Sequence, residues 1–435
     1  MAALDRALAE MHDQVWDDER GMVRLYGLHL VRETALGAFL DLEHARVARA
    51  ERALREVLRH QYSPTSDTRW AGTFKTHAAQ PDAGTKDSDG RTRDHEWRDY
   101  DPNWRQFLGL VLWVTQKLHG HVLPDDLNDA MLRAAHDAAR SEPQGRIGER
   151  YTNVALMHTW LQHACGIAPD GLATAVAAQV RGDGDIAEYN SPTYDAISLL
   201  AASLLVDFSS DGALQELGGL VRQRVGARLA TVWHHQLGVQ AGPYSRAYGF
   251  DPRLYVSLVS VLMTALGVPA AGPPRLDVNT THVHDLYFLP LFRRLCGGLR
   301  EHFSPIETAA ARRHEQRFGN AVATSVVEAD RVIGWEHGRR TRFALDQYAP
   351  FAMYSRDGFL GVRTRPDTDW VDVVETSPRV YELRCARRTG PDITHDVAAL
   401  TIVASRAPVT YENEMLFGDV TLRFPGISVE VRLPR

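Results

Sequence analysis

A short polar and aromatic segment stands directly before an apolar run of the 435-residue chain. Its sequence is EYNSPTYD, residues 188–195. Ser191 can cap a helix that begins here, and Pro192 is tolerated in a first helical turn, so the preceding residues lie in the loop at the helix N-terminus. Free N–H groups and the helix dipole attract anions at such a place. Four residues are therefore candidates for substrate contact or chemistry: Glu188, Tyr189, Asn190 and Tyr194.

A second segment, WHHQLGVQAGPYSRAYGFD, occupies residues 233–251. Tyr244, Arg246 and Tyr248 follow one another at every second position, so their side chains share one face if the backbone is extended. A phenol has an ordinary pKa near 10 and becomes a usable base only when cations lie close. Arg246 and the two histidines near the start of the segment can supply that charge. The segment is therefore a candidate for acid–base chemistry.

Three other places offer weaker signals. Asn153 stands at the start of a predicted helix, and Trp104 before another helix could form a stacking platform for a sugar. In the sequence HVHD, His282 and His284 could chelate a metal, with Asp285 next to them. Because no third ligand is evident nearby, we predict no metal site, and the question of metal binding at HVHD stays open.

The order of residues in the first two segments resembles polysaccharide lyases of the hyaluronan/chondroitin lyase and heparinase II/III type. In those enzymes an Asn is followed by a His, then a Tyr, and soon afterwards an Arg. Here Asn190 is followed by His234 and His235, by Tyr244 nine residues after His235, and by Arg246. The resemblance implies an α/α toroid followed by an antiparallel β-sandwich. It also implies β-elimination from a uronic-acid-containing saccharide.

Such an elimination assigns roles to the matched residues. Asn190 and Arg246 would neutralise the substrate carboxylate, which makes the developing enolate tolerable. Tyr248 or Tyr244 would remove the proton, with His235 as partner or alternative, and either tyrosine would protonate the departing oxygen. The remaining candidates would bind substrate: Glu188, Tyr189, Tyr194, Asn153, His234, Trp104 and Asp251. No cofactor is expected, since the chemistry needs none and the chain has no dinucleotide or P-loop motif.

Other functions remain open at this point. Glu188, Asp195 and Asp251 could act as general acid and base in glycoside hydrolysis, whose outcome depends on the separation of the carboxyl groups. The same acid–base pairs could dehydrate or cyclise a small lipid or a secondary metabolite. A non-catalytic scaffold or carbohydrate-binding protein is the least favoured alternative, because it needs no clusters of acid–base residues.

Residues 1–304 are predicted to form helix after helix, and residues 305–435 to form a separate antiparallel β-sandwich. Helical periodicity and cap signals indicate ten helical segments: 2–16, 33–60, 103–117, 125–141, 148–165, 171–181, 192–208, 211–234, 251–266 and 286–302. A long polar loop is predicted at 63–99. Short β-branched and aromatic runs indicate strands at 322–335, 341–354, 358–365, 369–375, 379–385, 398–405 and 419–433.

Composition excludes several classes of protein. The net charge of −6 disfavours a dedicated nucleic-acid or anionic-membrane binder. Three widely spaced cysteines argue against a disulfide framework or a cysteine zinc site. The first residues show no signal peptide, and no apolar run is long enough to span a membrane, so we expect a cytoplasmic protein. Its expected partner is a small molecule or an oligosaccharide, without nucleic acid or membrane, and no oligomeric state is predicted.

Overall fold

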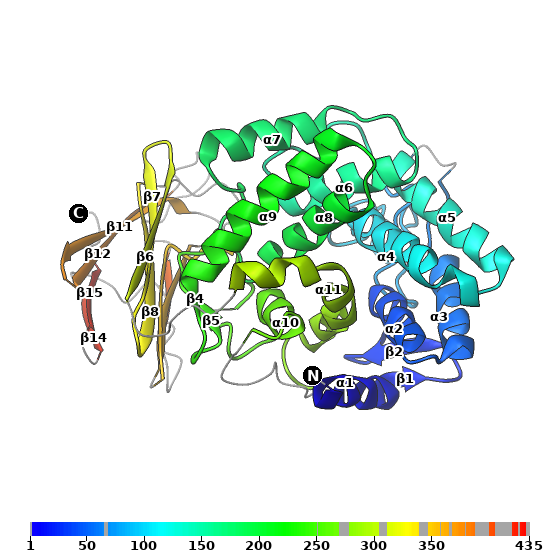
Figure 1. Cartoon of the computed structure of the whole chain (residues 1–435), viewed down its shortest axis with the longest axis horizontal. Coiled ribbons are helices and arrows are strands. Elements are labelled where there is room, and N and C mark those ends of the chain that lie inside the picture. Colours follow the sequence, from blue (N-terminus) through cyan, green and yellow to red (C-terminus); the bar gives the residue numbers. More distant parts are fainter. Residues whose placement is uncertain are drawn as a thin grey trace. The chain divides into compact units, whose positions relative to one another are not determined.

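In the computed structural model, helices dominate the chain up to residue 303, and strands follow from residue 312 (Figure 1). It describes residues 2–64, 68–249, 251–268, 278–303, 311–338, 347–356, 358–364, 368–378, 380–387, 400–404, 420–424 and 427–431. The predicted boundary between residues 304 and 305 lies outside the described residues, as do residues 341–346 of the predicted strand 341–354. In the described ranges, no helix combines the length and apolar character needed to cross a membrane.

The helices agree with the predicted segments in type and order, with short strands between some of them. The helices are α1 (Ala2–Val15), α2 (Val31–Glu43), α3 (Val47–Arg59), α4 (Trp104–His119), η1 (Gly120–Val122), α5 (Asp125–Arg140), α6 (Thr152–Ala164), α7 (Leu172–Asp183), α8 (Tyr194–Phe208), α9 (Gly212–Val232), α10 (Leu258–Ala265), η2 (Val283–Phe288), α11 (Leu289–Leu295) and η3 (Gly297–Phe303). The short strands are β1 (Trp16–Asp17), β2 (Met22–Leu25), β3 (Leu28–Leu30), β4 (Trp233–His234) and β5 (Val239–Gln240).

The contacts divide the chain into two compact units that alternate along the sequence. Unit 1 comprises residues 1–178, 200–220 and 275–298, and unit 2 comprises residues 179–199, 221–274 and 299–435. This division differs from the predicted one at residues 304 and 305, which follows the change from helices to strands. Two of the segments in unit 2, 179–199 and 221–274, come from the helical part of the chain.

Unit 1 packs α2 against α3 and α4, and α4 against α5 and α6. In α3 the buried residues Ala50, Ala53, Leu54 and Val57 recur at helical spacing, as an amphipathic helix requires. The predicted single helix at 33–60 is wrong in one respect, because it is broken between α2 and α3. Ala45 at the break has a φ of 59°, in the left-handed region, which cannot continue a right-handed helix.

The ten later strands form two sheets in unit 2. They are β6 (Arg312–Phe318), β7 (Ala321–Val327), β8 (Arg331–His337), β9 (Phe351–Ser355), β10 (Phe359–Thr364), β11 (Thr368–Ser377), β12 (Val380–Arg387), β13 (Leu400–Ala404), β14 (Val420–Phe424) and β15 (Ile427–Val431). One sheet has the order β13-β10-β9-β8-β7-β6 and the other β11-β12-β15-β14. The centre of the Tyr381 ring in β12 lies 5.1 Å from the ring centres of Trp335 and Phe351. These aromatic contacts join the two sheets.

Pairing in the sheets is antiparallel with one exception. β12 pairs with β15 in parallel, Val380 opposite Ser428, whereas the prediction was antiparallel throughout. A parallel pair needs a crossover connection. The chain provides one here, since it adds β13 to the six-stranded sheet before it returns through β14. The predicted run 322–335 is also two strands, β7 and β8, which pair with each other.

The six-stranded sheet approaches the loop that follows β5 very closely. A Cβ placed on Gly334 in β8 would lie 1.7 Å from the carbonyl oxygen of Gly242. From β7, the Ser325 hydroxyl donates to the same carbonyl at 2.5 Å. Tyr244 and Ala349 exchange backbone hydrogen bonds of 2.9 Å. The sheet is therefore the support on which this loop rests.

Gly334→Ala tests that support. The added methyl group overlaps a backbone atom that cannot rotate away, so we expect the free energy of unfolding to fall by about 1–3 kcal/mol. Chemical denaturation measures the change. Gly182→Ala is the matched control, because nothing lies within 4 Å of a Cβ there and the residue is in helix α7. Equal stability of the Gly334→Ala variant and the wild type would contradict the close approach.

Candidate functional site

The two segments singled out in the sequence meet in unit 2. The amide nitrogen of Asn190 donates to the carbonyl oxygens of Ala241 at 2.7 Å and of Pro243 at 2.8 Å. The Ser191 hydroxyl donates to the carbonyl of Arg246 at 2.6 Å. It also accepts from the backbone N–H of Tyr194 at 3.0 Å, which confirms the predicted cap of α8. The loop before α8 and the loop after β5 are therefore one connected structure.

Asn190 uses its whole hydrogen-bonding capacity inside the protein. Both amide hydrogens are donated to backbone carbonyls, and Oδ1 accepts from Arg228 at 3.2 Å and from Gln240 at 2.9 Å. The residue is fully buried and has a φ of 54°, in the left-handed region that asparagine tolerates better than most residues. Its amide thus holds the two loops together. That placement differs from the predicted contact with a substrate carboxylate.

A buried arginine on α9 forms ion pairs beneath these two loops. Arg228 donates from Nε to Asp185 and from Nη1 to Asp195, each at 2.7 Å. Its guanidinium carbon lies 4.7 Å from the centre of the Tyr189 ring. Burial, reinforced by Asp185 and opposed by Arg228, raises the pKa of Asp195 to about 6. Two carboxyl groups and one guanidinium are thus enclosed together without water access.

In the same loops, Arg246 links the carboxylate of Glu188 to Tyr194. It donates from Nη1 to Glu188 at 2.7 Å and from Nη2 to the Tyr194 hydroxyl at 3.1 Å. Its guanidinium carbon lies 4.1 Å from the centre of the Tyr194 ring. A third donor, Nε, reaches Gln347 at 2.9 Å. The Tyr194 hydroxyl is hydrogen-bonded to that of Tyr248, and Tyr248 is 37 % exposed.

Tyr244 lies elsewhere in the loop and is not equivalent to Tyr248. Its side chain is 1 % exposed and its hydroxyl donates to the carbonyl of Gln240 at 2.7 Å. Burial raises the pKa of Tyr244 well above its usual range. Of the two tyrosines that the sequence left open as the base, only Tyr248 lies where solvent reaches it.

The histidines and Asp251 have separate surroundings in unit 2. His234 is buried at the end of β4, accepts from the backbone N–H of Leu237 at 3.2 Å, and has its pKa lowered by burial. His235 is half-buried in the turn between β4 and β5. Asp251 accepts from Arg253 at 2.7 Å and is buried. His234 also interacts with the backbone of Glu328 and Ala329. Neither these contacts nor the pairing of Asp251 with Arg253 involve the tyrosine pair.

The two remaining substrate-binding candidates belong to unit 1. Trp104 begins α4, and the guanidinium carbon of Arg32 lies 5.6 Å from the centre of its ring. Asn153 is fully buried in the first turn of α6. Each is therefore part of the packing of unit 1.

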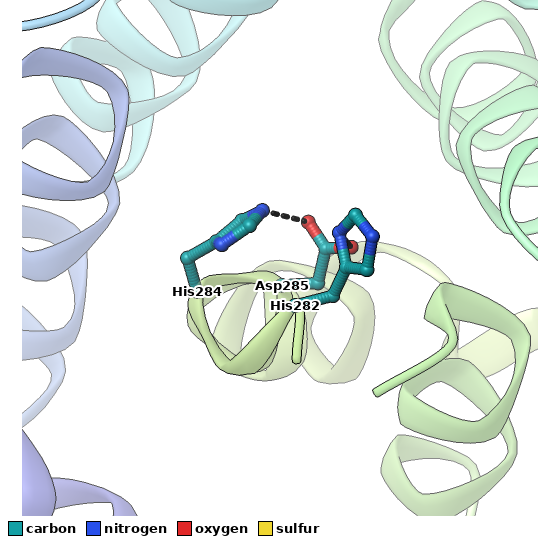
Figure 2. A group of neighbouring side chains, drawn as sticks. All are labelled: His282, His284 and Asp285. Atoms are coloured by element: carbon teal, nitrogen blue, oxygen red, sulfur yellow. Dashed lines mark ion pairs between the residues drawn. The ribbon is translucent and has the colours of Figure 1, made fainter. Parts of the chain in front are cut away.

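The HVHD sequence, also in unit 1, forms a close group of three side chains at the start of η2 (Figure 2). His282, His284 and Asp285 each offer a ligand atom, and these atoms lie within 4.8 Å of one another. Burial lowers the pKa of His282, although Asp285 opposes the effect. A third potential ligand atom, which the sequence analysis did not find, comes from Asp285, because η2 places its carboxyl group beside the two imidazoles.

Several residues of the site were not predicted: Asp185, Arg228, Gln240 and Gln347. A signal for Arg228 exists in the sequence, because it stands on the stripe formed by Val221, Val225, Leu229 and Val232, all of which are buried. A charge on the apolar face of a helix requires a buried partner. No comparable pattern marks Gln347. Its position depends on backbone hydrogen bonds between its own segment and the distant loop after β5.

A comparison with family models gives a match over most of the chain. A family model described as a domain of unknown function (DUF8769) matches residues 3–296. No curated protein matches the chain. The matched range includes both loops of the site and the HVHD group but ends before β6, so it leaves out Gln347.

Arg228→Met tests the buried ion pairs of the site. The substitution leaves two carboxyl groups buried without their cation, so we expect the free energy of unfolding to fall by about 3–5 kcal/mol. Denaturant unfolding measures the loss. Arg224→Met, at an exposed position of the same helix, is the matched control and should stay within about 0.5 kcal/mol of the wild type. A similar small change in both variants would show that the carboxyl groups do not depend on Arg228.

Asp195→Asn tests the raised pKa through the pH dependence of stability. Because the folded protein holds this proton more tightly than the unfolded chain, the contribution is fully present below pH 3.8 and is lost as pH rises through about 6. The asparagine variant has no such proton. The unfolding free energy of the wild type minus that of the variant should therefore decrease between about pH 4 and pH 7. A difference that is constant over this range would contradict the assignment.

Proposed function

We propose that the chain, which belongs to the DUF8769 family, is a carbon–oxygen lyase that acts by β-elimination on a uronic-acid-containing saccharide. Tyr248 and Tyr194 transfer the protons in this proposal, and Arg246 supplies the positive charge. The finer architecture that we propose with it is an α/α toroid with a β-sandwich, as in the lyases that the sequence resembles.

The hydrogen bond between the hydroxyls of Tyr194 and Tyr248 carries the proposal. An elimination needs a base for one proton and an acid for another, and the two groups must exchange a proton before the next turnover. Two phenols in direct contact can act as the base, as the acid and as the pair that exchanges the proton. Tyr248 is 37 % exposed whereas Tyr194 is 9 % exposed, so Tyr248 is the member of the pair that meets substrate first.

Arg246 makes the tyrosine pair competent as a base. Its guanidinium donates to the Tyr194 hydroxyl and lies over the Tyr194 ring, so it stabilises negative charge that forms on either oxygen. The same cation favours an enolate next to a carboxylate. Glu188 and Gln347 fix the guanidinium in this orientation, since each accepts one of its N–H groups.

The proposed step balances in protons and electrons. Tyr248, as phenolate, takes the proton from the carbon next to the carboxylate, and the released electron pair forms a carbon–carbon double bond. The carbon–oxygen bond on the neighbouring carbon breaks, and Tyr194 protonates the departing oxygen. The hydrogen bond between the two hydroxyls then returns the proton from Tyr248 to Tyr194. No oxidant, reductant or water is consumed.

The pairing of the carboxyl groups favours elimination over hydrolysis. Each of the three carboxyl groups proposed for hydrolysis accepts from an arginine: Glu188 from Arg246, Asp195 from Arg228 and Asp251 from Arg253. A hydrolase needs one of its carboxyl groups protonated as the acid and both directed at a glycosidic bond. The ion pairs instead direct Glu188 at Arg246 and Asp251 at Arg253.

The test is ultraviolet absorbance of the new double bond with a panel of uronic-acid saccharides. We expect turnover by the wild type, and a fall of about 10²- to 10⁴-fold in kcat for Tyr248→Phe and for Tyr194→Phe. Tyr244→Phe is the matched control. It removes a buried hydroxyl from the same loop, so it should lower stability by about 1–2 kcal/mol while kcat stays within a few fold below the melting temperature.

Other outcomes reject the proposal in distinct ways. Release of reducing ends without ultraviolet absorbance would assign hydrolysis. Loss of activity in Tyr244→Phe equal to that in Tyr248→Phe would show that the loop, and not the tyrosine pair, is required. A panel that gives no turnover with any saccharide would exclude this substrate class and favour a small apolar substrate.

A further inference from the structure

Three potential metal ligands project from one turn at the start of η2 in unit 1. Figure 2 shows His282, His284 and Asp285 on the same side of the ribbon. His282 has a φ of 61°, in the left-handed region, and the next residues begin a 3-10 helix. This backbone reversal brings the ring of His282 next to that of His284, with 5.3 Å between the ring centres.

The carboxyl group of Asp285 lies between the two imidazoles. Its Oδ2 is 4.0 Å from Nδ1 of His282, and its Oδ1 is 3.6 Å from Nε2 of His284. Ligand atoms around a tetrahedral zinc ion, at bonds of about 2.0–2.2 Å, are about 3.3 Å apart. All three ligand atoms lie within 4.8 Å of one another. Side-chain rotations that shorten these separations by up to about 1.5 Å would therefore enclose an ion.

A tyrosine from another part of unit 1 contacts the second nitrogen of His284. The Tyr26 hydroxyl is 3.1 Å from Nδ1 of His284, which leaves Nε2 directed at Asp285. Tyr26 and Gly27 have φ values of 54° and 77° in the two-residue turn between β2 and β3. Positive φ at both positions is typical of a type I′ hairpin turn. A partner on the second ring nitrogen is what metal-binding histidines usually have.

The exposure of the group suits an ion from solution. Asp285 is held by Arg32 at 3.5 Å, while Arg32 itself pairs more closely with Glu33 at 2.6 Å. The side chains of His282 and His284 are 25 % and 21 % exposed, and that of Asp285 is 5 % exposed. An ion can therefore reach the imidazoles from solvent and retain water on its open side.

We propose that His282 Nδ1, His284 Nε2 and the carboxylate of Asp285 bind a divalent first-row transition metal ion. Two imidazoles and one carboxylate are a ligand set that suits zinc and its neighbours rather than calcium or magnesium. Tyr26 orients His284 without binding the ion, and water completes the coordination. The site lies in unit 1 and is independent of the tyrosine pair, so either proposal can fail alone.

Equilibrium dialysis of the tag-free, chelator-treated full chain against Zn²⁺ tests the site. We expect one zinc ion per chain, and a visible absorption band when Co²⁺ replaces zinc. His284→Ala and Asp285→Asn should weaken binding by at least tenfold, and Tyr26→Phe by about tenfold. Zinc should also raise the melting temperature of the wild type but not that of His284→Ala.

His121→Ala is the matched control, because His121 is an exposed histidine of the same unit. It should retain one zinc ion per chain at unchanged affinity. The proposal is overturned by a wild type that binds no stoichiometric zinc, by His284→Ala with unchanged affinity, or by an equal loss in His121→Ala. Circular dichroism of each variant separates loss of the site from loss of the fold.

Discussion

The contact of Arg228 with Asp185 and Asp195 is the interaction on which unit 2 depends. One guanidinium faces two carboxyl groups and the amide oxygen of Asn190 in a place that water does not reach. Separated charges in such surroundings are costly, so the three segments that carry them are stable only when they stay together. The position of Asn190, and through it the path of the loop after β5, follows from this requirement.

The second constraint on the tyrosine pair comes from the β-sheet. Strand β8 runs so close to Gly242 that the loop after β5 cannot shift further toward the sheet, and Ser325 and Ala349 fix that loop by hydrogen bonds. Arg246 reaches Gln347 from the same edge. Helical and β segments thus each supply part of the support, which explains why the polar loops between them can hold buried charge.

Sequence patterns located the helices and most strands because periodic burial is a local property. The break at Ala45 could not be predicted, since no glycine or proline marks it. Strand β6 was missed because its residues, RRHEQRF, alternate between half-buried and exposed positions without an apolar face. In the site, residue types indicated the two loops correctly. The hydrogen-bond partners of Asn190 and Tyr244, however, depend on how distant segments of the chain pack together. The sequence alone cannot separate a buried phenol from an exposed one.

The alternation of the two units along the chain has a consequence for how the family is delimited. The matched residues 3–296 cover the helices and both polar loops, yet unit 2 also contains residues 299–435. A polypeptide ending at residue 296 would keep Arg228, Arg246 and Tyr248 but lose the strands against which their loop is built. The stretch that the family model matches and the compact unit that the contacts define therefore have different bounds, and fragments for expression are better chosen by the second.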